Sequence, residues 1–218
     1  MIHLAIECST GVLGLALLED LRGLGKVSLS ATGAASEILP QAVDLLLESA
    51  KKKSADIGMV SVSKGPGNYS SLRVAHSFGS GLAIGLSVPL VSVSPFDTLA
   101  LQWRHLDAEA IFFLVDARQS EVLGERRVRD LKTGDWVSDP LWTPMDSPGN
   151  AVALLSRVQD GAVAGPGVIY LPSDPSRNWP GLSFPGGTEV PPDPFFQGRV
   201  AFLSGGDSSI VYGRSAVD

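Results

Sequence analysis

The stretch MVSVSKGPGNYSSLRVAHSFGSGLAIGLSVPLVSV, residues 59–93, decides the fold of this chain. A β-type run at 59–63 meets a Gly-Pro-Gly turn, and a helix rich in small residues is predicted from about Ser70 to Leu86. A second β-type run ends at Val93. The stretch therefore predicts a strand, a tight loop, a helix and a strand, with backbone N–H groups at the helix N-terminus, where an anion is favoured.

The loop KGPGNYSS, residues 64–71, is the candidate anion site. Gly67 can adopt an unusual backbone angle there, and Ser70 or Ser71 can cap the helix. The lysine precedes the glycines and no Gly-Lys-Ser/Thr closes the loop, so it is neither a Walker loop nor a G-x-G-x-x-G motif. From spacing alone, a tight turn with a helix cap is favoured over a phosphate site.

The predicted helix also carries a repeat of small residues, in which Ala75, Gly79 and Ala83 recur every four positions. Glycine costs about 1 kcal/mol relative to alanine inside a helix, so the accumulation needs a reason. Close approach of another backbone is such a reason. The approaching element is either the sheet beneath the helix or a helix of another chain.

The residues before this stretch predict three strands and a helix. Strands are expected at 2–7, 13–19 and 27–31, and a helix at 36–53 with Ser36 as its N-cap. The apolar positions of that helix occupy more than one face, so one stripe should pack on the sheet and the excess could form a partner surface. The order β-β-β-α-β-α-β predicts an α/β fold with a mixed sheet.

The second half of the chain is expected to be smaller and less regular. Strands are predicted at 110–116, 121–128, 136–142 and 162–164, with short helices at 96–103 and 150–158. Eleven of the 15 prolines lie between Pro140 and Pro194, so the last third is expected to be mostly loop. We divide the chain into an N-terminal subdomain, residues 1–105, and a proline-rich C-terminal subdomain, residues 106–218.

Composition excludes several classes of protein. A formal net charge of −6 argues against a protein that grips nucleic acid alone. The densest basic segment, residues 126–132, is interpreted as a solvated strand edge. Cys8 is the only cysteine, so no internal disulfide can form. A buried thiol is expected, and a single cysteine is compatible with a reducing cytoplasm. No window reaches the roughly 18 apolar residues of a membrane span.

The residues that carry catalytic chemistry in other proteins are scattered here. His3, His76 and His105 lie on a predicted strand, a predicted helix and a connection, with no His-x-x-x-His or CxxC spacing. No G-x-S-x-G motif is present to expose a serine nucleophile. We therefore predict neither a metal site nor a catalytic residue.

Four segments together resemble one known family: GPGNYSSLR (65–73), GLAIGLSVPLVSVSPFDTLA (81–100), VDARQSEV (115–122) and IVYGR (210–214). They are similar to the TsaB (YeaZ) family, which works in making threonylcarbamoyladenosine in tRNA. The match is strong to about residue 125 and patchy at 161–171. The resemblance implies an actin/Hsp70-like (ASKHA) architecture, with two ribonuclease-H-like halves, mixed five-stranded sheets and a reduced second half.

The resemblance also implies a role as a degenerate paralogue of the catalytic subunit TsaD. TsaD has a His-x-x-x-His metal motif after this helix, and the matching positions here are Pro95 and Leu99, which cannot bind a metal. We expect a non-catalytic, cytoplasmic partner of a TsaD-like subunit that acts with a TsaE-like ATPase, forms a homodimer in isolation and contacts tRNA only indirectly. The expected partner-binding residues lie on the two N-terminal helices: Leu39, Val43, Leu46, Ala75, Gly79 and Ala83.

Departures from the family pattern put nucleotide binding in doubt. Glu7 and Cys8 stand where Asp-Thr is common, Ser80 stands where many relatives have lysine, and the late helix before Tyr212 looks lost. We expect no cofactor, or weak or vestigial ATP or ADP binding, at these positions: Ser9, Thr10, Gly65, Gly67 and Asn68. The alternative is an ASKHA-fold nucleotide-binding enzyme, either an ATPase or a TsaD-like carbamoyltransferase.

The motif DARQSE leaves two interpretations open. Asp116, Arg118 and Glu121 could form a salt-bridged hairpin turn, which we favour, or line the cleft between the halves.

Overall fold

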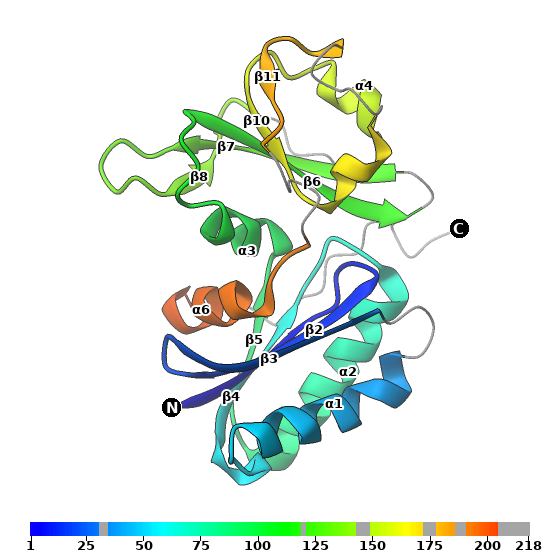
Figure 1. Cartoon of the computed structure of the whole chain (residues 1–218), viewed down its shortest axis with the longest axis vertical. Helices are drawn as coiled ribbons and strands as arrows, with labels where there is room; N and C mark the ends of the chain where they lie inside the picture. The colour runs from blue at the N-terminus through cyan, green and yellow to red at the C-terminus, as the bar shows by residue number, and fades with distance from the viewer. Residues whose placement is uncertain (31–34, 119–120, 143–148, 172–177, 186–190, 205–218) are drawn as a thin grey trace.

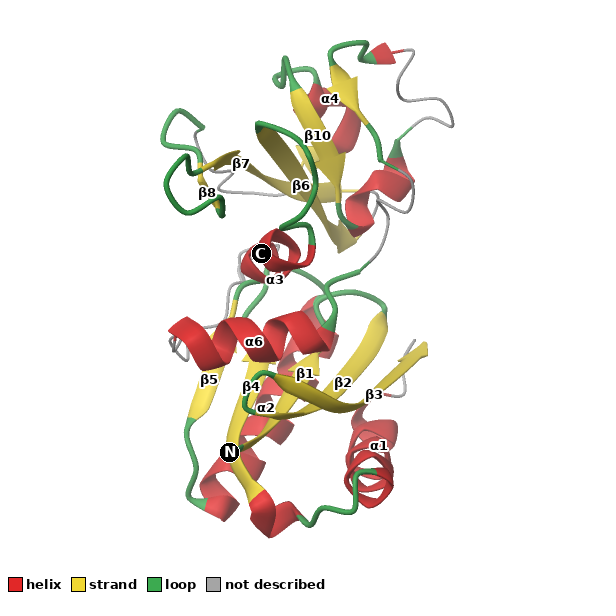
Figure 2. Cartoon of the chain, turned by 60° about the vertical axis from the view of Figure 1, so that its left-hand side comes forward, coloured by secondary structure: helices red, strands yellow, loops and turns green. Residues whose placement is uncertain are grey.

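The computed structural model describes the chain except for residues 31–34, 119–120, 143–148, 172–177, 186–190 and 205–218. Two β-sheets form two lobes, one above the other along the long axis of the molecule, and helices α3 and α6 lie between them (Figures 1 and 2). Each lobe has its own buried apolar core. The expected α/β fold with two mixed sheets is confirmed.

The first sheet has five strands in the order β3-β2-β1-β4-β5. The first three strands pair antiparallel, whereas β4 and β5 run parallel to β1, so the sheet is mixed as predicted. Strand β3 begins five residues earlier than the predicted start at 27, because it continues the hairpin from β2. The strands are β1 (Ile2–Glu7), β2 (Val12–Glu19), β3 (Arg22–Ser30), β4 (Ile57–Ser63) and β5 (Leu90–Val93).

Helices cover both faces of this sheet. On one face lie α1 (Ala35–Ser49) and α2 (Tyr69–Leu86), which contact each other, and on the other lies α6 (Pro194–Ser204). Side chains of β1 alternate between the two faces: Leu4 and Ile6 pack toward α1 and α2, whereas Ala5 packs toward α6. Burial on both faces explains why β1 is apolar throughout, as expected for a strand with helices on either side.

Helix α6 corrects the expectation that the late helix is lost, whereas the other described elements after Pro140 are short. Pro194 occupies the first position of the helix, where the missing N–H costs nothing. The Asp193 Oδ1 atom accepts a hydrogen bond from the Phe195 N–H at 2.8 Å and so supports the helix start. A Cβ on Gly198 would lie 2.5 Å from Leu18, so the helix packs closely on the sheet.

The second sheet has six strands, in the order β11-β10-β6-β7-β8 with β9 also paired to β7. Only β6 and β7 are long, so the reduction of this half lies in strand length rather than in strand number. The strands are β6 (Ala110–Arg118), β7 (Glu121–Arg129), β8 (Trp136–Ser138), β9 (Gly149–Asn150), β10 (Gly161–Ala164) and β11 (Leu182–Ser183).

Two further helices cover this sheet. Helix α3 (Pro95–Gln102) packs on the face that carries Ile111 and Phe113, and α4 (Ala151–Leu155) packs on the face that carries Phe112 and Leu114. The 3-10 turns η1 (Ser54–Asp56) and η2 (Pro166–Tyr170) complete the described elements. None of the helices in the described part of the chain has the length and apolarity that a membrane crossing requires.

The two lobes are joined through α3 and α6. These helices contact each other, and the Gln102 side chain binds the backbone on the way back to the first lobe, accepting from the Asp193 N–H at 3.1 Å. Helix α6 therefore packs on the first sheet although it follows the second sheet in the chain. The division of the chain at residue 105 stays a prediction.

Candidate functional site

Two turns meet at one end of the first sheet, where β1 and β4 both end. The turn after β1 carries Ser9 and Thr10, and the turn after β4 carries Gly65, Gly67 and Asn68. The Asn68 N–H donates to the Ser9 carbonyl at 2.8 Å. A Cβ on Gly67 would lie 2.2 Å from the same carbonyl oxygen, and the φ of Gly67 is +156°, so glycine is required there. The structure therefore brings all five predicted nucleotide-binding residues together.

The same contacts satisfy a backbone donor at the start of α2. Ser9, Thr10 and Asn68 are buried, and the Asn68 N–H is already bound within the protein. Asn68, rather than Ser70 or Ser71, is the helix cap, because its side chain accepts from the Ser71 N–H at 3.2 Å. The expected serine cap is therefore wrong, and nucleotide binding at these residues stays a prediction.

Glu7 is the unexpected member of this site. Its carboxyl is only 2% exposed, and its Oε1 atom accepts from the Ser9 N–H at 2.6 Å. Burial raises the pKa of this carboxyl to about 7, against the opposing effect of its hydrogen bonds with Ser9. The hydroxyls of Ser9 and Ser63 are buried beside the Glu7 carboxyl and favour its ionised form, so the three side chains form one buried polar cluster. The sequence marked Glu7 only as a departure from the family pattern.

A small cavity of about 200 Å³ adjoins Glu7 and Thr10. On its outer side, the Lys26 ammonium forms an ion pair with Asp193 at 2.6 Å. The cavity thus holds one buried carboxyl and one paired cation. An ionised Glu7 would oppose an anionic ligand at this point.

A second buried polar group lies deeper between the first sheet and α6. The His3 Nε2 atom lies 2.9 Å from the Ser61 hydroxyl, and the Gln197 amide donates to the Ile6 carbonyl and to that hydroxyl. Burial lowers the pKa of His3 to about 4, because desolvation disfavours the charged ring. Sequence analysis missed Gln197 because no helix was expected at its position.

Metal-binding chemistry is not assembled in the described residues, where no group of three His, Cys, Asp or Glu side chains comes together. Pro95 and Leu99, the positions matched to the TsaD metal motif, are buried in α3. Cys8 is buried as expected, and burial raises the pKa of its thiol, so it is a poor nucleophile.

The six predicted partner-binding residues all point inward. Leu39, Val43, Leu46, Ala75 and Ala83 belong to the core beneath the first sheet, and a Cβ on Gly79 would lie 2.6 Å from Val62. Direct contact of these side chains with a partner is incompatible with their burial. The element that packs closely against Gly79 is thus the sheet beneath α2 and not a helix of another chain.

The outward faces of α1 and α2 carry different residues. Leu45 on α1 is 60% exposed and Ile84 on α2 is 78% exposed. Gly81 and Gly85 are also exposed, and no atom lies within 4 Å of where their Cβ atoms would be. We call these four residues the outer face of α1 and α2.

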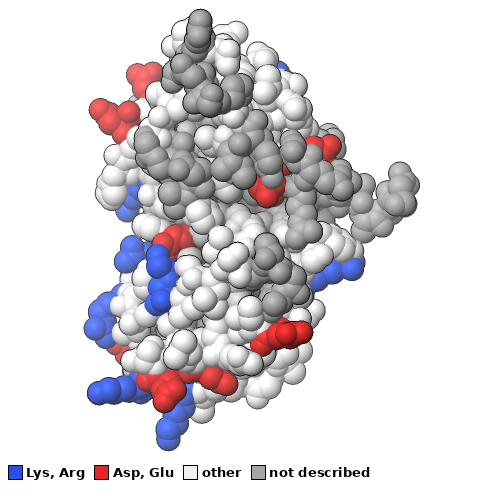
Figure 3. Space-filling model, turned by 45° about the vertical axis from the view of Figure 1, so that its right-hand side comes forward, with Lys and Arg blue, Asp and Glu red and all other residues white. Residues whose placement is uncertain are grey.

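The basic segment after residue 125 is structural, so the expected solvated strand edge is wrong. Its guanidinium groups have partners within the protein: Arg126 binds Asp139 and Asp160, Arg127 binds Asp97 and Glu125, and Arg129 binds the Arg104 and Leu106 carbonyls. Lysine and arginine side chains do not merge into one continuous basic surface on the side shown in Figure 3.

The ends of the DARQSE hairpin are described, but its tip is not. Asp116 and Glu121 lie at the ends of β6 and β7, whose register places Arg118 opposite Glu121. Residues 119–120 lie outside the described residues, so both interpretations of this motif stay predictions.

The sequence of this chain is similar to those of curated proteins of known pathway. The chain is 31% identical to the tRNA threonylcarbamoyladenosine biosynthesis protein TsaB of Escherichia coli over 134 residues, which is 61% of this chain and 57% of that protein. It is 34% identical to TsaB of Bacillus subtilis over 123 residues, or 56% of this chain and 53% of that protein. The chain thus spans little more than half the length of these curated relatives.

Solved structures share the fold over nearly the whole chain. YeaZ from Pseudomonas aeruginosa superimposes with a TM-score of 0.69 at 22% identity and covers 97% of this chain and 99% of its own. The activator of the 2-hydroxyisocaproyl-CoA dehydratase from Clostridium difficile, solved with bound ADPNP, superimposes at 0.54 with 10% identity over 93% of this chain and 94% of its own.

A family model described as TsaD, tRNA N6-adenosine threonylcarbamoyltransferase, matches residues 25–157, which is more than half of the chain. Curated relatives at 27–34% identity include TsaB proteins of several bacteria and two tRNA N6-adenosine threonylcarbamoyltransferases of Nitratidesulfovibrio vulgaris. The chain therefore belongs to the TsaD family, and within it to the TsaB (YeaZ) group.

Proposed function

We propose that this chain is a non-catalytic partner and scaffold subunit in the synthesis of threonylcarbamoyladenosine at adenosine 37 of tRNA, and that it binds a TsaD-like catalytic subunit. Membership of the TsaB group supports the pathway. The observation that carries the partner role is the outer face of α1 and α2, which exposes two large apolar side chains on adjacent helices. Large apolar side chains exposed on two contacting helices offer an apolar contact to a partner.

The shape of this face suits a helix of the partner. Gly81 and Gly85 leave the backbone of α2 uncovered, so a second helix can approach it closely and pack on Ile84 and Leu45. Exposed acidic residues on α1 favour a partner with basic side chains, and two of them lie within one helical turn of Leu45: Asp44 and Glu48.

The absence of a catalytic role rests on the residues at the matched positions. Pro95 and Leu99 offer no metal ligand, and Cys8 is buried with a raised thiol pKa. The chain alone should therefore show no threonylcarbamoyl transfer to tRNA. Activity should appear when a TsaD-like subunit and a TsaE-like ATPase are added.

Binding to a purified TsaD-like subunit tests the proposal. We expect Leu45→Asp and Ile84→Asp each to weaken binding about tenfold or more, since each would place a charge in an apolar contact. Leu131→Asp is the matched control, because Leu131 is 98% exposed and lies in the second lobe. Equal affinity of all three variants and the wild type would contradict the proposed surface.

The same face should support a homodimer when no partner is present. Light scattering would then report a dimer for the wild type and a monomer for Leu45→Asp. A variant that stays dimeric would assign the dimer contact to another surface.

Nucleotide binding is the second candidate function. The observation that favours it is the buried polar cluster at the site, formed by Glu7 and the hydroxyls of Ser9 and Ser63. The bound Asn68 N–H and the Glu7 carboxyl argue against a phosphate there. Calorimetry with Mg-ATP decides between them: micromolar binding supports an ASKHA-type nucleotide site, and no heat at millimolar nucleotide rejects it.

A further inference from the structure

Residues 191–194, Pro-Pro-Asp-Pro, lead into α6, and we call them the strap. Three of the four residues are prolines, which have a restricted φ angle and no backbone N–H, so the strap is stiff and Asp193 provides its only backbone donor. Pro192 and Pro194 are buried, whereas Asp193 is partly exposed. The strap can therefore form no ladder of backbone hydrogen bonds, and side-chain contacts must hold it in place.

Side chains of α3 and β3 hold the strap. Gln102, the last residue of α3, accepts from the Asp193 N–H at 3.1 Å and donates to the Pro191 carbonyl at 3.4 Å. From β3, the Lys26 ammonium pairs with the Asp193 carboxylate at 2.6 Å. The same carboxylate accepts from the Phe195 N–H at the start of α6. Asp193 is thus the point at which α3, β3 and α6 are joined.

The strap also forms one wall of the cavity of about 200 Å³ beside Glu7 and Thr10. The Pro194 ring lies against the first sheet, because a Cβ on Gly14 would lie 3.1 Å from its Cδ atom. With the strap in this position, Thr10 is only 7% exposed although it lines the cavity. The strap therefore limits the access of solvent to this end of the sheet.

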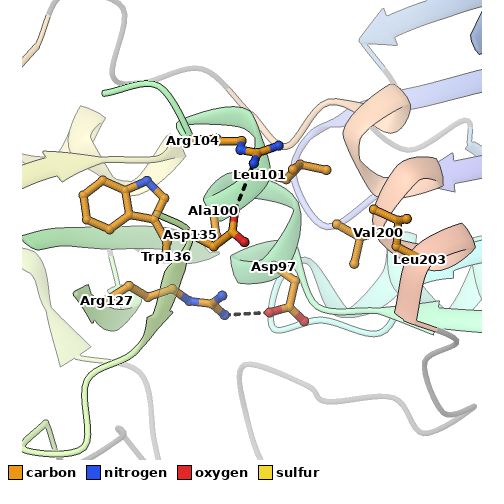
Figure 4. Close-up of a pocket in the computed structure, with 9 residues that line it drawn as sticks. All are labelled: Asp97, Ala100, Leu101, Arg104, Arg127, Asp135, Trp136, Val200 and Leu203. Atoms are coloured by element: carbon orange, nitrogen blue, oxygen red, sulfur yellow. Dashed lines mark hydrogen bonds and ion pairs between the residues drawn. The ribbon is translucent and has the colours of Figure 1, made fainter. Parts of the chain in front are cut away.

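The joint between α3 and α6, which carries the strap, is only partly packed. The two helices contact each other, but a groove of about 480 Å³ also lies between them. Figure 4 shows this groove with Leu101 on α3 and with Val200 and Leu203 on α6. A partly packed joint has low local stability, so the helices can shift relative to each other without unfolding of either lobe. The contacts of Gln102 and Lys26 are therefore the main restraint on the strap.

We propose that the strap keeps this cavity closed while Lys26 is paired with Asp193, and that breaking the pair opens the cavity to solutes. Both side chains of the pair are partly exposed, so water competes for them and the pair can open in the native protein. Because Gln102 ties the same strap to α3, opening also loosens the contact between the lobes. A ligand of the cavity binds the open form and shifts the equilibrium toward it, whether or not that ligand is a nucleotide.

Thiol labelling of the full chain with Thr10→Cys, in a Cys8→Ala background, tests this proposal. Lys26→Met removes the charge but keeps a long side chain, and it should speed labelling about two- to fivefold, as expected for loss of a partly exposed ion pair. Asp193→Asn should have the same effect, because asparagine still caps α6. High salt should speed labelling when Lys26 is present and not in Lys26→Met, since salt screens the pair.

Lys52→Met is the matched control, because it breaks a different lysine ion pair of the first lobe, with Glu19, and it should leave labelling unchanged. Hydrogen exchange of chains without the added cysteine is an independent measurement. The Asp193 amide should exchange about two- to fivefold faster in Lys26→Met than in the wild type or in Lys52→Met. Equal labelling and equal exchange with and without Lys26→Met would overturn the proposal, and so would an equal acceleration by Lys52→Met.

Discussion

Replacing Glu7 by glutamine is expected to change how the stability of the protein depends on pH. Burial raises the pKa of the Glu7 carboxyl from an ordinary 4.5 to about 7 in the folded protein. Between these values the folded protein holds a proton on Glu7 that the unfolded chain has lost. The contribution of Glu7 to the free energy of unfolding therefore falls by about 3 kcal/mol as the pH rises from 4.5 to 7.

His3 has the opposite effect over nearly the same range. Burial lowers its pKa from 6.5 to about 4, so the unfolded chain binds a proton in this window that the folded protein does not. Its contribution to the free energy of unfolding therefore falls by about 3 kcal/mol as the pH drops from 6.5 to 4. Between pH 4.5 and 6.5 the two slopes cancel in the wild type.

Single substitutions should separate the two slopes. In Glu7→Gln the slope of His3 remains, so the variant should lose about 1.4 kcal/mol of stability for each pH unit below 6.5. In His3→Gln the slope of Glu7 remains, so that variant should gain stability by a similar amount as the pH falls over this window. The double variant should again be flat.

Urea unfolding followed by tryptophan fluorescence at pH 4.5, 5.5, 6.5 and 8 measures these slopes. The quantity to compare is the free energy of unfolding of Glu7→Gln minus that of the wild type. This difference should be about 3 kcal/mol larger at pH 8 than near pH 4.5, because glutamine is never ionised. Glu37→Gln removes the same charge from an exposed position on α1 and serves as the control. A difference between Glu7→Gln and the wild type that does not vary with pH would refute the reasoning.

Three further predictions follow from single contacts. Asn68→Ala should lower stability by about 1 kcal/mol through loss of the α2 cap, whereas Ser70→Ala should be neutral, and thermal unfolding compares them. In the same assay Gly79→Val should lower stability by about 1–3 kcal/mol through contact with the sheet, whereas Gly81→Ala, in open space, should raise it by up to about 1 kcal/mol. A thiol reagent should modify Cys8 only after denaturant is added; rapid labelling of the native protein would contradict its burial.

Sequence patterns predicted the elements of the first lobe well, because each has a strong local cause. Apolar β-type runs, glycine turns and helix periodicity placed β1, β2, β4 and α2 within one or two residues. Helix α6 was missed because its neighbourhood is rich in proline, although Pro194 stands at the first helical position, where proline is tolerated. A high density of prolines does not by itself predict a loop, because a proline at the first position of a helix is compatible with that helix.

The candidate site was only partly predictable, since its contacts join residues far apart in the chain. Sequence analysis singled out both turns, but the hydrogen bond between Asn68 and Ser9 depends on β4 pairing beside β1. The burial of Glu7 follows from that pairing and from α6, which was not expected. The sequence around Glu7, at the end of an apolar strand, does not indicate that its side chain is fully desolvated.

The proposed partner surface illustrates why helical periodicity alone does not locate an interface. Leu39, Val43 and Leu46 recur at helical spacing, and this spacing identifies a buried face without saying what covers it. In the fold, the first sheet covers this face of α1, so its apolar side chains are buried inside the first lobe. What remains outside is Leu45 on α1 and Ile84 on α2, which have no role in the core. A partner surface on these helices must therefore depend on the residues that interrupt the pattern, and charge substitutions there test binding without disturbing the fold.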